Sequence, residues 1–77
     1  MNMEDWVENN GKNEIPVGER LLLQVTGSKK KHRWEHLPVI GSYDENWGWY
    51  LEDEKMMDTF EVEAWQFLPK PLNRERL

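Results

Sequence analysis

The stretch ERLLLQVT, residues 19 to 26, carries an aliphatic side chain at every second position, at Leu21, Leu23 and Val25. Successive side chains of a β-strand point to opposite faces of a sheet, so these three share one face. An amphipathic helix would instead repeat its apolar residues with a period of about 3.6. The alternation therefore predicts a half-buried strand, and it makes a sheet the organising element of the chain.

Three later segments also predict strands, each separated from the next by turn-forming or polar residues. They are RWEHLPVIGSY at residues 33 to 43, NWGWYLE at residues 46 to 52 and FEVEAWQFL at residues 60 to 68. Pro38 has no backbone donor, which places the first of them at an edge, a bulge or a break. Alternation in the second puts Trp47 and Trp49 on one face and leaves Tyr50 on the other.

These patterns predict a mainly β protein, with a small antiparallel sheet of about four short strands in a single domain over residues 1 to 77. Asn2 is suited to cap a short helical turn that runs to Val7. Residues 1 to 14 and 70 to 77 are expected to be flexible or peripheral ends. The first of these ends contains the whole of the polar loop ENNGKNE, and the second contains Pro71.

The core has to come from side chains alone, because the chain contains no cysteine. Five Trp, two Tyr and two Phe are available, and each aromatic side chain buries roughly 150–250 Å². The acidic N-terminus does not resemble a signal peptide, and no apolar run approaches the roughly 20 residues of a membrane span. We therefore expect a soluble, cytoplasmic protein, and no motif in the sequence predicts a cofactor.

Charge is distributed unevenly, within a net charge of -5. Residues 44 to 63 carry eight carboxylates against a single lysine, whereas residues 29 to 36 carry four cations against one carboxylate. Two interpretations stay open. The regions pair with each other across the sheet, or they form separate solvated surfaces that select different partners.

Two segments, GSYDENWGWYLED and FEVEAWQFLPKPL, resemble a family of short phage and prophage proteins, the domain-of-unknown-function family numbered 551. Its members combine a G-x-Y…W-x-W strand with a C-terminal segment of the type V-T-H-W-M-P-L-P-E-P-P. The matching residues are Gly41, Tyr43, Trp47, Trp49, Val62, Trp65, Leu68, Pro69 and Pro71. The chain departs from the pattern at Ala64, Phe67 and Leu72. The resemblance implies a phage-associated origin and a small β-rich fold, and it implies no activity.

The sequence contains few residues in arrangements that support catalysis or metal binding. His32 and His36 have the spacing of zinc ligands on a helix, but their segment predicts a loop or strand and no further ligand is evident. The segment from Asp44 lacks both the glycine and the terminal glutamate that a calcium loop requires. We therefore expect no catalytic residue, no metal site and no enzyme.

Three functions remain, and the first is favoured. A protein-binding module that inhibits or adapts a host or phage protein would use the acidic and aromatic residues Tyr50, Glu52, Asp53, Glu54, Glu61, Glu63 and Trp65. A nucleic-acid-binding protein would use the cationic stretch Lys29, Lys30, Lys31 and Arg33 together with Trp34. A structural homo-oligomer would pair through an exposed edge strand or through the proline-containing tail.

Overall fold

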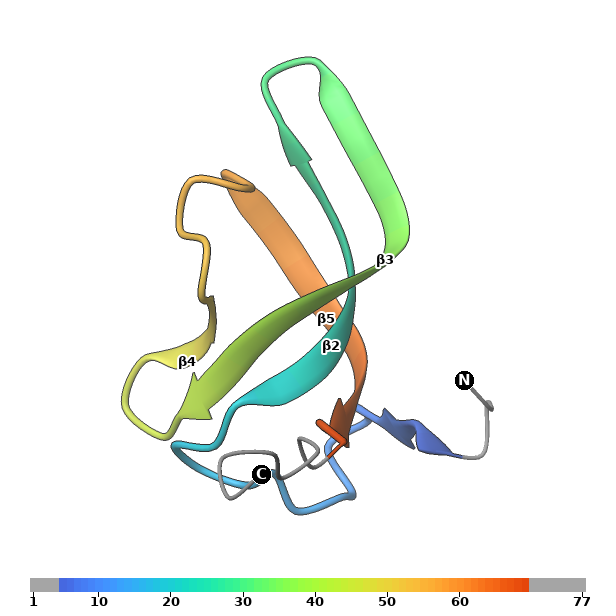
Figure 1. Ribbon diagram of the computed structural model, residues 1–77, viewed down its shortest axis with the longest axis vertical. Helices are drawn as coiled ribbons and strands as arrows, with labels where there is room; N and C mark the ends of the chain where they lie inside the picture. The colour runs from blue at the N-terminus through green and yellow to red at the C-terminus, as the bar shows by residue number, and fades with distance from the viewer. Residues whose placement is uncertain (1–4, 70–77) are drawn as a thin grey trace, which may run out of the picture.

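A computed structural model describes residues 5 to 69 of the chain. They form one antiparallel sheet of five strands in the order β1-β5-β2-β3-β4 (Figure 1). The strands are β1 (Val7–Glu8), β2 (Leu21–Lys29), β3 (His32–Asp44), β4 (Gly48–Leu51) and β5 (Thr59–Phe67). The prediction of a small, mainly β fold is confirmed, although a short fifth strand is added and β3 is long, with 13 residues.

The additional strand, β1, overlaps the predicted helical turn only at Val7, the last residue of that turn. Val7 and Glu8 pair with Trp65 and Ala64 of β5, so the chain is extended at these two residues, whereas Asp5 adopts a 3₁₀ conformation. The start of the predicted turn, at Asn2, lies outside the described residues. A strand of two residues is too short for alternation to reveal, and it forms because β5 offers an unpaired edge.

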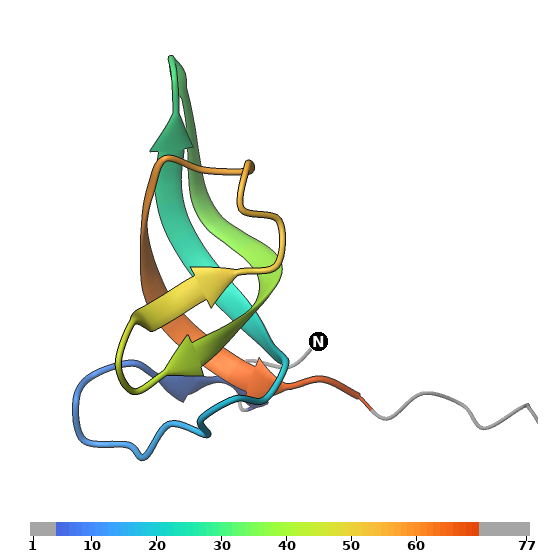
Figure 2. The same cartoon turned by 90° about the vertical axis from the view of Figure 1, so that its left-hand side faces the viewer.

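The sheet curls around its inner face. β2 and β3 form a long hairpin whose tip stands beyond the other strands, while β4 pairs only with the last residues of β3 (Figures 1 and 2). β5 then returns along the other side of β2. In consequence β4 and β5, which are not paired with each other, are the two strands that approach the open side of the curl.

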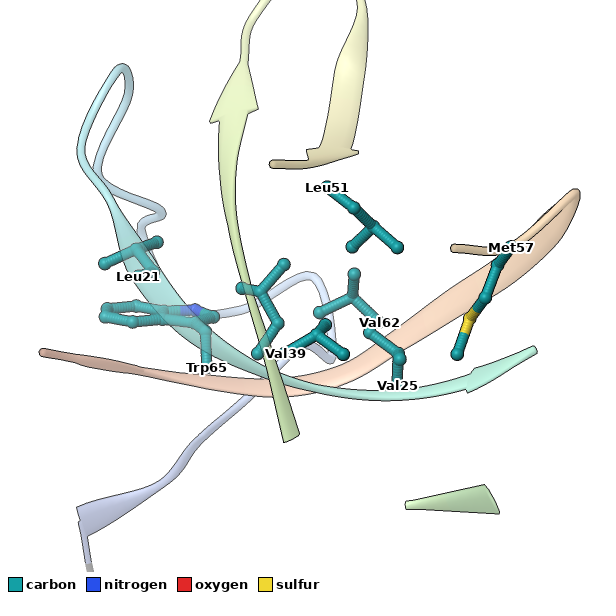
Figure 3. Packing of buried hydrophobic residues seen from close by; sticks show 8 residues of the cluster. Leu21, Val25, Val39, Leu51, Met57, Val62 and Trp65 are labelled. Atoms are coloured by element: carbon teal, nitrogen blue, oxygen red, sulfur yellow. The ribbon is translucent and has the colours of Figure 1, made fainter. Parts of the chain in front are cut away.

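The core fills the inside of this curl. Leu21, Leu23 and Val25 of β2 are fully buried, as their alternation predicted. Leu51 of β4 and Val62 of β5 point toward one another across the interior (Figure 3). Burial of aliphatic side chains contributes about 1.5–3 kcal/mol each, so this cluster is the main source of stability in a chain without disulfides.

A β-bulge reverses the side-chain alternation in β5. Val25 pairs with Val62 while Gln24 pairs with Ala64, so Glu63 is an extra residue opposite β2. An extra residue shifts every later side chain to the other face of the strand. Trp65 therefore joins Val62 on the inner face and is only 4% exposed. Its predicted place on an exposed binding surface was wrong, because uninterrupted alternation was assumed.

A second bulge lies on the opposite side of β2. Val25 pairs with Leu37 and Gly27 with Trp34, leaving an extra residue in β3 near His36. His36 adopts a φ of 54°, a left-handed conformation that is uncommon for residues other than glycine. Pro38 lies two residues further on, where β2 is the only described strand that pairs with β3. The prediction that Pro38 marks an edge or bulge is thus confirmed.

The described residues contain no helix long and apolar enough to cross a membrane.

Candidate protein-binding groove

The open side of the curl is bounded by two strand edges that lack partners in residues 5 to 69. β4 pairs only with β3. β5 pairs with β2 on one side, whereas on its other side β1 covers only Ala64 and Trp65. Asn9 continues this cover: its backbone N–H donates to the Glu63 carbonyl at 3.0 Å, and its Nδ2 donates to the Val62 carbonyl at 2.9 Å. The edge of β5 before Val62 is left open.

Two adjoining hollows follow this opening, and we call them together the seam groove. The larger has a volume of about 660 Å³ and is lined by Asn9, Trp49 and residues 58 to 62. The smaller has a volume of about 190 Å³ and is lined by residues 49 to 51, Glu54, Met57 and Phe60. Trp49 of β4 and Phe60 of β5 line both hollows. The groove therefore has an aromatic floor between two strand edges.

Carboxylates surround this floor. Glu54, Asp58 and Glu61 are exposed, and none of the three forms an ion pair with a described residue. Asp58 does accept a hydrogen bond from the Lys30 backbone N–H, at 3.3 Å. Tyr50 is 46% exposed beside the smaller hollow, as its predicted position on the outer face required. Three uncompensated negative charges beside exposed aromatic surface favour a cationic partner.

Two of the predicted acidic residues have local structural roles. Glu52 forms two hydrogen bonds with the Arg20 guanidinium, one of them 3.1 Å long from Nη2 to Oε1. These bonds lower the pKa of the Glu52 carboxyl below its ordinary value. Asp53 accepts a hydrogen bond from the Lys55 N–H at 3.2 Å and shapes the turn between β4 and β5. Glu52 and Asp53 are exposed, but their carboxylates already accept hydrogen bonds from other parts of the protein.

The remaining predicted residues lie apart from the seam groove. Glu63 is half-buried on the outer face and contacts His36, whereas Trp65 is in the core. Conversely, Trp49, Asp58 and Phe60 line the groove although they were not among the predicted binding residues. Alternation shows which face a side chain occupies, but it does not show which strands meet at an opening. That information depends on the curl of the sheet.

The cationic stretch occupies the tip of the β2–β3 hairpin, which projects from the sheet (Figure 2). Lys30, Lys31 and Arg33 are exposed. The base of the tip is fixed by two contacts: the Asp58 N–H donates to the Ser28 carbonyl at 2.9 Å, and the Lys29 ammonium donates to the Lys55 carbonyl. The predicted pairing of the two charged regions is therefore limited, since among the described residues the one contact between their side chains within ion-pair distance joins the His36 imidazole to Glu63.

Two tryptophans, one in β3 near the hairpin tip and one in the turn after β3, lie in contrasting environments. Trp34 is half-buried and packs against the core, where His32 stacks on it with ring centroids 5.8 Å apart. Trp47 does not share a strand face with Trp49, because β4 begins only at Gly48, whose φ is 84°. Trp47 instead lies in the turn before β4 and is 85% exposed.

Side chains suited to metal binding do not converge in residues 5 to 69. No group of three or more His, Cys, Asp or Glu side chains is arranged to hold a metal ion there. The Ser28 hydroxyl lies 3.2 Å from the Thr59 hydroxyl, and so it contacts another neutral hydroxyl and not a general base. The seam groove presents negative charge and apolar surface, and both are features that bind a ligand.

No family model, curated protein or solved structure matches the chain. The resemblance to family 551 and the phage-associated origin that it implies stay predictions.

Proposed function

We propose that the protein is a small non-enzymatic module that binds a basic segment of a partner protein in the seam groove. The observation that carries the proposal is the set of three exposed carboxylates, Glu54, Asp58 and Glu61, around the aromatic floor formed by Trp49 and Phe60. Partly buried aromatic side chains supply contact area, and the carboxylates select lysine or arginine. Through this contact the module inhibits or adapts a host or phage protein.

Affinity capture from a nuclease-treated bacterial lysate tests the proposal with two matched variants. One variant, E54Q/D58N/E61Q, removes the groove carboxylates. The control, E14Q/E19Q/E45Q, removes three exposed carboxylates away from the groove. We expect a captured protein to be lost from the first variant and retained by the control, and to dissociate as salt rises, because salt screens exposed charges. Equal capture by both variants, or capture that salt does not weaken, contradicts the proposal.

A second function, nucleic-acid binding, is favoured by the projecting hairpin tip. Lys30, Lys31 and Arg33 are exposed there without an acidic partner from the 44 to 63 region within ion-pair distance. A duplex contacted by four cations would show a salt slope of about -0.9 per phosphate contact. The variant K29A/K30A/K31A/R33A distinguishes the two functions. It abolishes nucleic-acid binding if the tip is the site, and it leaves capture of a basic protein partner intact.

A further inference from the structure

From the edge of β5 that no described strand covers, we infer how the partner is held: its basic segment adds to the sheet as an extended strand along Thr59 to Glu61. This inference rests on the proposed function, since it assigns a binding mode to the same groove. Strand addition to a free sheet edge is a common mode of peptide recognition, in which main-chain hydrogen bonds supply affinity and alternate side chains supply specificity.

The contact between Asn9 and β5 shows which way the backbone N–H and C=O groups of β5 point along this edge. The Val62 carbonyl points away from β2, because it accepts a hydrogen bond from Asn9 Nδ2 at 2.9 Å. In an antiparallel strand, residues two apart turn their N–H and C=O groups to the same side. Phe60 therefore turns both of its backbone groups away from β2 and into the larger hollow, which Phe60 and Val62 line.

No strand of the described part occupies this edge. β1 ends at Glu8, and the Asn9 side chain is the last group of that segment to contact the edge of β5. An added strand would thus continue the row of pairing that β1 begins. Exposed hydrogen-bonding groups at a sheet edge form a template for another chain, and here they lie beside Trp49 on the facing strand.

The charges around this edge determine which residue types the added strand would contain. Asp58 and Glu61 lie at either end of the open edge, and Glu54 borders the adjoining hollow. Lys30 approaches Asp58 only through its backbone N–H, so a ligand ammonium group retains access to that carboxylate. An extended peptide that alternates cationic and apolar residues fits both features, because its apolar side chains face Trp49 and Phe60 while its cationic side chains face the carboxylates.

A fluorescent peptide of alternating lysine and valine is the probe, compared with two versions in which either the valines or the lysines are N-methylated. Each version blocks one edge of the extended peptide. We expect one of the two to bind about tenfold or more weakly, the equivalent of one or two hydrogen bonds. Amide hydrogen exchange of Phe60 should slow when the unmodified peptide is bound.

The outcomes separate this inference from the proposed function. Equal affinity of all three peptides, with no change in exchange at Phe60, overturns strand addition, while loss of binding by E54Q/D58N/E61Q would still support a basic ligand in the groove. Absence of binding at millimolar peptide overturns both. Protection of the Phe60 amide that grows with protein concentration in the absence of peptide also overturns the inference, since a second copy then occupies the edge.

Discussion

The imidazole of His36 and the carboxylate of Glu63 meet across β2, with Nδ1 and Oε1 2.9 Å apart. Each residue lies at a β-bulge, one in β3 and one in β5, and the two bulges flank neighbouring positions of β2: the bulge in β5 lies opposite Gln24 and Val25, and the bulge in β3 lies opposite the stretch from Val25 to Gly27. A bulge bends its strand and increases the local twist. The two bulges together therefore bend the sheet at one level, which separates the projecting hairpin from the curled body.

The left-handed backbone at His36 leads to the first prediction. Replacement by valine should destabilise the protein more than replacement by glycine, because a φ of 54° costs a side chain with Cβ about 1–2 kcal/mol. Both variants lose the imidazole, so their difference in unfolding free energy, measured by urea denaturation, isolates the backbone. The same substitutions at Arg33, an exposed residue of β3, should give the reverse order, since valine favours extended strands. Equal stability of the two His36 variants would refute the prediction.

The second prediction concerns Gly27 of β2, where the backbone lies very close to Met57 and to the start of β5. A Cβ there would lie 2.3 Å from the Thr59 carbonyl oxygen and 2.7 Å from the Met57 sulfur. Gly27→Ala should therefore lower the unfolding free energy by about 1–3 kcal/mol, as overpacking does. Lys31→Ala, at the exposed hairpin tip, should change stability by less than about 0.5 kcal/mol. A wild-type unfolding curve for Gly27→Ala would show that the approach is looser than described.

The two tryptophans whose positions differ from the alternation pattern lead to the third prediction. Trp65 is 4% exposed and Trp47 is 85% exposed. Trp65→Ala should cost about 3–5 kcal/mol of unfolding free energy, as for other buried aromatic residues. Trp47→Ala should leave the thermal unfolding midpoint almost unchanged. If Trp65→Ala prevents folding, Trp65→Phe gives the milder comparison. Similar midpoints for the Trp65 and Trp47 variants would place Trp65 at the surface after all.

The fourth prediction concerns pH and the contact between Arg20 and Glu52. Hydrogen bonding to Arg20 lowers the pKa of the Glu52 carboxyl in the folded protein. The ion pair therefore contributes stability above the ordinary carboxyl pKa, and this contribution is lost as pH falls through the lower, folded-state pKa. Because both groups are exposed, the effect is small and is screened by salt.

The thermal unfolding midpoints of Glu52→Gln and of the wild type, compared at neutral and at strongly acidic pH, check this expected loss of stability. The variant should be slightly less stable at neutral pH and equal to the wild type in strongly acidic buffer. Glu19→Gln, which removes a neighbouring exposed carboxylate that forms no ion pair with residues 5 to 69, controls for the change in net charge. A difference between Glu52→Gln and the wild type that grows on acidification would contradict the assignment.

The sequence by itself determined the fold class and the buried face of β2. The alternation of Leu21, Leu23 and Val25 is a local property of an extended chain, and burial of that face follows wherever the strand pairs. Pro38 also marked an unpaired or irregular position, because a missing backbone donor restricts a residue in any sheet. The exposure of Tyr50 followed from the same alternation.

Only the tertiary structure decided the position of Trp65, the existence of β1 and the site of the groove. Alternation predicts a constant face only while the register is unbroken, and the extra residue at Glu63 becomes visible when β5 is paired with β2. The seam groove depends on which edges remain open after the sheet curls, a property of five strands together. Local patterns in the sequence encode faces, whereas edges and openings arise from the pairing of segments far apart in the chain.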